Sequence, residues 1–188
     1  MSEFRSETDH NHQHRGKSSE ILLDKKRILA NLPIISGQVI LDAGCGNGYM
    51  SKEFYKLTGE LGKVYALDPD ALSIDALKAE TLNTNIEAFV GDITKQTELG
   101  ASCLDLVYIS TVIHGFTRTQ MTGFVNEVKR ILKPNGTLAI VEIKKEDTPF
   151  GPPLDMRFLP EELKAIIDLK STQCFEVGKF FYMQLFEK

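Results

Sequence analysis

The stretch LDAGCGNGYM, residues 41–50, constrains the fold of this chain more than any other feature of its sequence. Three glycines, Gly44, Gly46 and Gly48, fall within five residues and directly follow the apolar run 39–41. A glycine-rich turn lets the backbone approach a ligand, and the helix that follows such a turn presents free N–H groups. In a doubly wound sheet these turns lie at the carboxyl ends of strands, where ligands bind. The stretch therefore predicts a strand–turn–helix unit that holds a nucleotide-like molecule.

Apolar, β-branched runs alternate with segments of helical periodicity along the rest of the chain. This alternation predicts an α/β fold, a Rossmann-like doubly wound sheet of about seven strands with helices on both faces. The sheet should be mostly parallel, with one exception at its end. Only Gly178 and Lys179 separate the last two strand-like runs, which is too short for a parallel crossover, so we expect a C-terminal antiparallel hairpin.

The expected elements can be placed by residue range. We expect strands at 39–41, 64–68, 86–90, 104–110 and 137–143, and the hairpin within 175–188. We expect a first helix that begins after Ser18 or Ser19, which could cap it, and ends before Pro33. We expect four more helices at 49–57, 73–81, 119–132 and 161–169. Asp70 is expected to be the N-cap of the helix at 73–81.

Length and composition indicate an ordinary globular protein. With 188 residues, we expect one domain at 18–188, preceded by a flexible polar arm at 1–17. A net charge of -4 gives no general electrostatic reason to bind nucleic acid, and no apolar run reaches the length of a membrane span. The N-terminus lacks the apolar centre of a signal peptide, and an odd number of widely spaced cysteines suggests reduced thiols. We therefore expect a cytoplasmic protein with the free cysteines Cys45, Cys103 and Cys174.

The polar arm carries the tract DHNHQH at residues 9–14. Imidazoles and carboxylates suit zinc or nickel, but a spacing of one residue fits no closed structural site. We therefore expect no metal. A solvated arm and an arm that covers the ligand are the alternatives, and the covering arm is the better functional hypothesis.

The acidic residues around the glycine turn narrow the choice of ligand. A dinucleotide-binding turn reads G-x-G-x-x-G, whereas here Tyr49 stands where the third glycine would be. Asp42, two residues before Gly44, suits a positively charged ligand better than a pyrophosphate, although it could also cap a turn. Asp68 ends the next expected strand, where a carboxylate can accept hydrogen bonds from a ribose diol of either ligand type.

The pattern D-x-G-x-G-x-G after an apolar strand resembles motif I of the class I S-adenosylmethionine-dependent methyltransferases. The resemblance covers about residues 18–188 and includes LKPNGTLAIVE at 132–142 and the final hairpin. It implies that the turn packs against the methionine part of S-adenosylmethionine, with Asp42 near its ammonium group. It further implies an adenine site at Gly91-Asp92-Ile93, in which the Asp92 carboxylate accepts from the adenine amino group and the Ile93 N–H meets the ring. The cofactor-binding residues implied in this way are Asp42, Gly44, Cys45, Gly46, Gly48, Asp68, Pro69, Asp92, Ile93 and Ser110.

Two of these residues also have simpler interpretations. Asp92 follows a glycine and could be a turn residue. Cys45 is well explained as a small buried filler, because free cysteine behaves as a small hydrophobe.

Within the family, the loop EDTPFGPP at 146–153 and the leading helix resemble the ubiquinone/menaquinone-biosynthesis type (methyltransferase type 11/25-like). Phe150 and Met156 could form an apolar wall for an acceptor, or the proline-rich loop could be a rigid surface connection. A quinone acceptor is doubtful, because a chain of 188 residues has little inserted lid for a prenyl tail. Arsenite is disfavoured because Cys103 and Cys174 are poorly placed to share an arsenic.

The methyl acceptor should lie beyond the carboxyl ends of the expected strands 104–110 and 137–143. Displacement at a sulfonium mainly requires that the nucleophile be aligned, and a base is needed only when the acceptor must lose a proton. His114, in STVIHGF just past the first of these strands, is the catalytic candidate. Its alternative role is to hold a loop or contact the cofactor.

The sequence thus favours an S-adenosylmethionine-dependent methyltransferase that acts on a small-molecule acceptor. A non-catalytic S-adenosylmethionine-binding module is the alternative. An NAD-dependent dehydrogenase is less favoured, because of Asp42, Tyr49 and the antiparallel ending. The acceptor, the methylated atom and the oligomeric state are left open.

Overall fold

Seven strands form one sheet in the order β3-β2-β1-β4-β5-β7-β6 in the computed structural model, which describes residues 22–188. Strands β1 to β5 pair in parallel, and β7 runs antiparallel to both of its neighbours, β5 and β6. The strands are β1 (Val39–Ala43), β2 (Lys63–Asp68), β3 (Ile86–Val90), β4 (Leu104–Ser110), β5 (Leu132–Ile143), β6 (Lys170–Glu176) and β7 (Phe181–Glu187). The predicted doubly wound sheet and its antiparallel C-terminal hairpin are confirmed.

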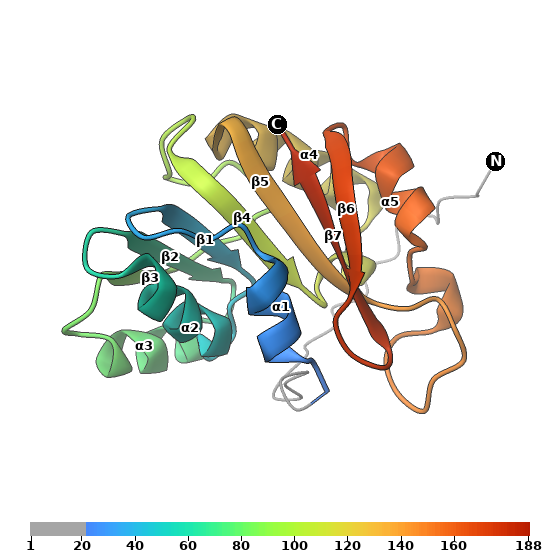
Figure 1. Ribbon diagram of the computed structural model, residues 1–188, viewed down its shortest axis with the longest axis horizontal. Coiled ribbons are helices and arrows are strands. Elements are labelled where there is room, and N and C mark those ends of the chain that lie inside the picture. The colour runs from blue at the N-terminus through green and yellow to red at the C-terminus, as the bar shows by residue number, and fades with distance from the viewer. Residues whose placement is uncertain (1–21) are drawn as a thin grey trace.

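Helices cover both faces of this sheet (Figure 1). Helices α1, α2 and α3 contribute Ile28, Phe54 and Leu77 to one buried apolar cluster, and α4 and α5 contribute Phe124 and Leu163 to the other. Figure 1 shows α1 and α2 in front of the sheet and α4 behind it. The helices are α1 (Lys25–Asn31), α2 (Tyr49–Thr58), α3 (Ala71–Glu80), α4 (Arg118–Ile131) and α5 (Pro160–Ile166), with short 3-10 helices η2 (Ile113–Gly115) and η3 (Leu154–Met156).

The helix starts follow from side-chain capping. Asp70 accepts from the Ser73 N–H at the start of α3, which confirms it as the N-cap, and Thr117 and Gln120 form a capping box on α4. Helix α1 is shorter than expected: its N-cap is Asp24, whose carboxylate accepts from the Arg27 N–H. The expected caps Ser18 and Ser19 lie outside the described residues.

Two strand boundaries differ from the sequence prediction. Strand β5 begins at Leu132 and not at 137, because Pro134-Asn135-Gly136, which is typical of a turn, forms a local kink inside a continuous strand. Asn135 adopts a positive φ of 63°, and its backbone N–H donates to the carbonyl of Lys188, the C-terminal residue, which lies beside it. Strand β6 begins at Lys170 and not at 175, because its sequence KSTQCFE is polar and the edge strand leaves most of its side chains partly or fully exposed. Pairing with β7 forms this strand, and apolar alternation could not reveal it.

Within residues 22–188, no helix is long and apolar enough to cross a bilayer. The predicted arm at 1–17 lies outside the described residues.

Candidate cofactor and acceptor site

The glycine turn between β1 and α2 has the backbone that only glycines adopt without strain. Gly44, Gly46 and Gly48 have φ values of 73°, 51° and 73°. A Cβ on Gly48 would lie 2.3 Å from Leu77 of α3, so this residue is needed for close packing. A Cβ on Gly46 would meet no atom of residues 22–188 within 4 Å, so among these residues nothing packs against it. Gly46 is therefore the glycine at which a ligand can approach the backbone.

The carboxyl end of β2 holds the turn in place. The Gly46 N–H donates to one oxygen of Asp68 at 2.8 Å, and the Asp70 N–H donates to the other at 2.9 Å. The Leu67 carbonyl accepts from the N–H groups of both Gly44 and Cys45. Because a carboxylate has about four acceptor positions, Asp68 can bind this turn and still accept from a ligand.

Asp42 lies beneath the turn and is 2% exposed. Ser51 of α2 donates its hydroxyl to Asp42 at 2.6 Å. Burial raises the pKa of Asp42 to about 7, although the hydrogen bonds from Ser51 act in the opposite direction. A negative charge here is costly in the protein alone, so a positively charged ligand group nearby would favour it.

Two buried hydroxyls lie on strand β4 next to Asp42. Tyr108 is in register with Asp42, and Ser110 follows it on the same face of the strand. Neither hydroxyl makes a hydrogen bond within residues 22–188; they lie near each other, but the geometry falls short of one. Burial raises the pKa of Tyr108, so its phenol stays protonated. Ser110 was predicted from the sequence and Tyr108 was not, although its spacing of two residues from Ser110 in an expected strand was an available signal.

The remaining predicted cofactor residues have mixed environments. Cys45 is buried, and burial raises the pKa of its thiol, which fits the small-filler interpretation. Ile93 is buried in the core cluster on the α4 face, whereas Pro69 is exposed. Asp92 accepts from the N–H and hydroxyl of Thr94, so it caps its own turn. Burial raises the pKa of Asp92, but the hydrogen bonds from Thr94 and Lys95 outweigh it and lower the pKa overall.

His114, the predicted catalytic residue, sits on η2 and is 9% exposed. Its ring Nδ1 lies 2.9 Å from an oxygen of Glu142, which is fully buried at the carboxyl end of β5. The His114 backbone N–H also points to Glu142, at 3.4 Å, and the Ile143 N–H does so at 3.3 Å. His114 was predicted from the sequence, but its pairing with Glu142 was not, because 28 residues separate the two in the chain.

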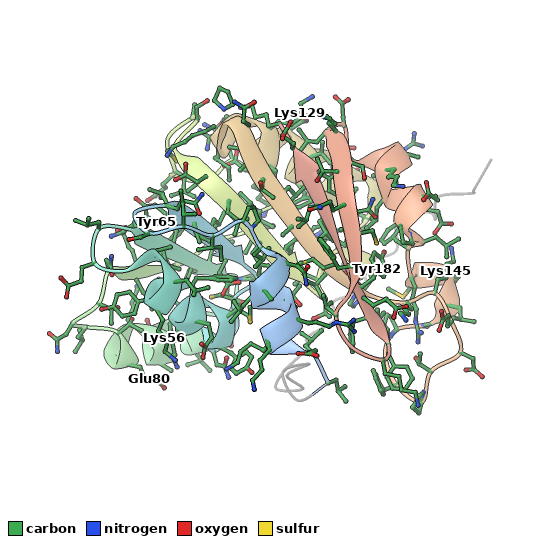
Figure 2. The ribbon with its side chains drawn as sticks, viewed as in Figure 1. Lys56, Tyr65, Glu80, Lys129, Lys145 and Tyr182 are labelled. Atoms are coloured by element: carbon green, nitrogen blue, oxygen red, sulfur yellow. The ribbon has the colours of Figure 1, made fainter. Side chains whose placement is uncertain are left out.

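Tyr182 of β7 lies opposite Glu142 in the antiparallel register. Its hydroxyl donates to the Phe158 carbonyl at 2.8 Å, which ties the segment before α5 to the carboxyl end of β5. Burial raises the pKa of Tyr182, and the nearby Glu142 raises it further. In Figure 2, Tyr182 and Lys145 lie at the same side of the molecule, away from Lys129.

The proline-containing loop after β5 is held from within. Arg157 is 5% exposed and donates to the carbonyls of Lys144, Glu146, Phe150 and Pro152. The Phe150 ring packs edge-on against Phe180 with centroids 5.1 Å apart. These contacts favour the rigid-connection interpretation of the loop over a wall that faces an acceptor.

The other candidate sites on the molecule lie away from the glycine turn or outside the described residues. Two surface hollows of about 550 and 530 Å³ lie elsewhere: one is lined by Lys129, Lys164 and Asp168, the other by Leu32, Thr137 and Phe175. Among residues 22–188, no group of three or more His, Cys, Asp or Glu is arranged to hold a metal ion. The tract at 9–14, and with it the arm predicted to cover the ligand, lies outside the described residues.

Comparison with known proteins gives a consistent result. A family model described as a methyltransferase domain matches residues 40–136, which include the glycine turn, Asp68, Asp92 and His114. An uncharacterized methyltransferase of Synechocystis sp. is 32% identical over 127 residues, which are 67% of this chain and 57% of that protein. The mitochondrial ubiquinone biosynthesis O-methyltransferase of Mus musculus is 30% identical over 117 residues, which are 59% of this chain and 30% of that protein. The chain thus spans only part of the length of these relatives.

Solved structures extend the likeness to nearly the whole chain. A SAM-dependent methyltransferase from Aquifex aeolicus is 27% identical with a TM-score of 0.79, covering 92% of this chain and 93% of that one. A TehB-like SAM-dependent methyltransferase from Corynebacterium glutamicum shares the fold at 21% identity and a TM-score of 0.68, covering 87% and 85%.

Proposed function

The chain belongs to the methyltransferase domain family, whose cofactor is S-adenosylmethionine, and from this premise we propose that it methylates a small-molecule acceptor. When bound, the cofactor supplies a methyl group on a sulfonium, which is already a good leaving group. The protein's own task is then to orient the two reactants and, where the acceptor carries a proton, to remove it. The NAD-dependent dehydrogenase considered from the sequence has no support in the family match or in the structures of similar fold.

The cofactor proposal rests on one observation above all. The Gly46 N–H donates a hydrogen bond to Asp68, and no atom of residues 22–188 packs against the position of a Gly46 Cβ. A ligand there would meet the turn and the Asp68 carboxylate together. We assign the ribose hydroxyls to Asp68 and the adenine to Asp92 and the Ile93 N–H, with Pro69 beside the ribose. Asp42 supports the ligand's ammonium group from below the turn, with Ser110 on the neighbouring strand.

The acceptor lies beyond the ends of β4 and β5, next to His114. The relative from Mus musculus bears the name of an O-methyltransferase of ubiquinone biosynthesis, which makes hydroxylated rings reasonable first compounds to test. Arsenite is a poor choice, because Cys45 is buried within the glycine turn, Cys103 precedes β4, and Cys174 is exposed on the edge strand β6.

Replacement of Asp68 tests the cofactor assignment. Asp68→Ala removes the acceptor of both the ribose and the Gly46 N–H. We expect binding of S-adenosylmethionine to weaken by roughly 10-fold to 100-fold, since a hydrogen bond to a charged group contributes about 1.5–3 kcal/mol. Titration calorimetry with S-adenosylmethionine, S-adenosylhomocysteine and NAD measures this. The control is Glu87→Gln, an exposed acid on β3.

Unchanged affinity in Asp68→Ala would count against the assignment, and binding of NAD without S-adenosylmethionine would overturn the proposed function. Binding without methylation of any compound in a metabolite panel would favour the non-catalytic binding module.

A further inference from the structure

We propose that Glu142 is a positioning residue that holds the His114 ring as a proton acceptor, and that the methyl acceptor is therefore a hydroxyl compound of phenolic or enolic type. This inference rests on the proposed function, which it narrows from any small molecule to one that must lose a proton.

The Glu142–His114 pair is built so that the ring nitrogens have different roles. Glu142 is fully buried, and its two oxygens accept from the backbone N–H groups of His114 at 3.4 Å and Ile143 at 3.3 Å. His114 Nδ1 lies 2.9 Å from the oxygen that also accepts from Ile143. A carboxylate only accepts hydrogen bonds, so the proposed arrangement places a proton on Nδ1, where it can be donated to Glu142. The lone pair of the ring is then on Nε2.

Strand β7 reinforces this arrangement. Tyr182 is in register with Glu142, but its hydroxyl donates to the Phe158 carbonyl at 2.8 Å. Because that proton is committed to Phe158, the Tyr182 hydroxyl does not donate to Glu142. The carboxylate is left to face the imidazole.

A buried carboxylate behind the ring favours one kind of chemistry. When the ring takes a proton it becomes a cation, and Glu142 at 2.9 Å stabilises that cation in a site with little water. An acceptor with no proton to lose, such as a thioether or a tertiary amine, would gain nothing from this pair. The pair therefore indicates an acceptor whose attacking atom carries a hydrogen.

The proton balance of the step is simple. The acceptor O–H gives its proton to His114 Nε2 while its oxygen bonds to the methyl carbon. The carbon–sulfur bond breaks and its electron pair stays on sulfur, which becomes a neutral thioether. The positive charge of the sulfonium thus ends on the His114 ring, opposite Glu142.

The neighbouring segment suits a molecule with a carbon skeleton. The Tyr182–Phe158 hydrogen bond holds the segment before α5 at this end of the sheet. Leu154 and Leu159 on that segment are 47% and 46% exposed, and Phe158 is half-buried. In our proposal this apolar segment borders the acceptor, and an apolar ring or chain that bears an acidic hydroxyl would suit it better than a small polar acceptor.

The tautomer can be tested without knowing the acceptor. The chain has four histidines, so nitrogen-15 spectra of wild type and His114→Gln identify the His114 ring by difference. At pH 8, with S-adenosylhomocysteine bound, we expect a proton on Nδ1 and a bare Nε2. A proton on Nε2 would overturn the inference and leave the methyltransferase proposal untouched.

The role of the charge is tested by Glu142→Gln, which keeps a carbonyl acceptor of the same shape. The probes are catechol and 4-nitrocatechol, whose hydroxyl is already ionised near neutral pH. We expect Glu142→Gln to lower kcat for catechol on the order of 100-fold, to lower it much less for 4-nitrocatechol, and to leave the KM for S-adenosylmethionine unchanged. Glu176→Gln, an exposed acid on β6, is the matched control.

Equal losses on both probes, or no loss on either, would mean that Glu142 only anchors η2, which would overturn the inference. If wild type binds S-adenosylmethionine but methylates neither phenol, the acceptor class is wrong while the methyltransferase proposal stands. If S-adenosylmethionine does not bind at all, the proposed function itself fails.

Discussion

At the scale of single residues, several polar groups of the proposed site are buried. Asp42 is buried beside Ser51, Glu142 is buried beside His114, and the Tyr108 hydroxyl is buried without a hydrogen bond among the described residues. Burying such groups costs free energy unless partners compensate. In the proposed function, the ligand's ammonium group would compensate part of the cost at Asp42.

Asp42 gives the clearest prediction at this scale. Its pKa rises from 3.8 in the unfolded chain to about 7 in the folded protein, so between these pH values the folded state binds more protons. The free energy of unfolding should therefore fall as pH rises from 4 to 7, by about 4 kcal/mol at most. Asp42→Asn cannot ionise and should lose less stability over this range. Urea unfolding of both proteins without cofactor, at pH 5 and at pH 8, measures this loss. An equal change in the free energy of unfolding for the two proteins would contradict the prediction.

At the scale of elements, the glycine turn is where sequence prediction was most successful. The spacing of an apolar strand, three glycines and an amphipathic helix is a local signal, and local signals survive in any tertiary setting. The element boundaries that failed, at β5 and β6, depend on pairing with distant strands: Lys170 pairs with Glu187 and Leu132 with Leu104. The sequence could not reveal these partners.

Alanine substitutions at two glycines of the turn should affect stability and cofactor binding to different extents. Gly48→Ala places a Cβ against Leu77 at a positive φ, so we expect it to cost about 2–3 kcal/mol of unfolding free energy. Gly46→Ala meets open space, so it should cost only about 1–2 kcal/mol from its positive φ. Its added methyl occupies the ligand side, so it should weaken S-adenosylmethionine binding more than Gly48→Ala does.

Denaturant unfolding and calorimetry on the same samples test this separation. The control is Gly100→Ala, because its Cβ would lie 4.0 Å from Cys103 in ordinary contact. The reverse ranking, with Gly46→Ala the less stable variant, would be inconsistent with the open space over that residue.

At the scale of the whole molecule, β7 joins the two halves of the fold. It lies between β5 and β6, with Met183 in the core cluster of the α1–α3 face and Phe186 in that of the α4–α5 face. The sequence predicted the antiparallel pairing of the last two strands, because the connection between them is short. It did not predict that β7 would pair with β5. That position is favoured because it buries apolar side chains of β7 on both faces of the sheet.

Truncation of Phe186 tests the importance of this insertion. The residue is fully buried, so Phe186→Ala should lower the free energy of unfolding by about 3–5 kcal/mol. Leu61→Ala, at a residue 88% exposed, should change it by less than about 0.5 kcal/mol. Thermal and denaturant unfolding followed by circular dichroism measure both. A small effect at Phe186 would mean that β7 contributes little to the core.

The sequence by itself determined the elements of the proposed cofactor site. The turn, its leading acid Asp42, and Asp68 at the next strand end lie within short, regular βα units, and strand and helix periodicity place them at the carboxyl ends of neighbouring strands. Tertiary structure alone decided the pair of residues proposed to face the acceptor. His114 and Glu142 are 28 residues apart and meet only because β4 and β5 pair in parallel with their carboxyl ends together. Local spacing carries no information about such contacts, since the register of two strands is set by the packing of both sheet faces.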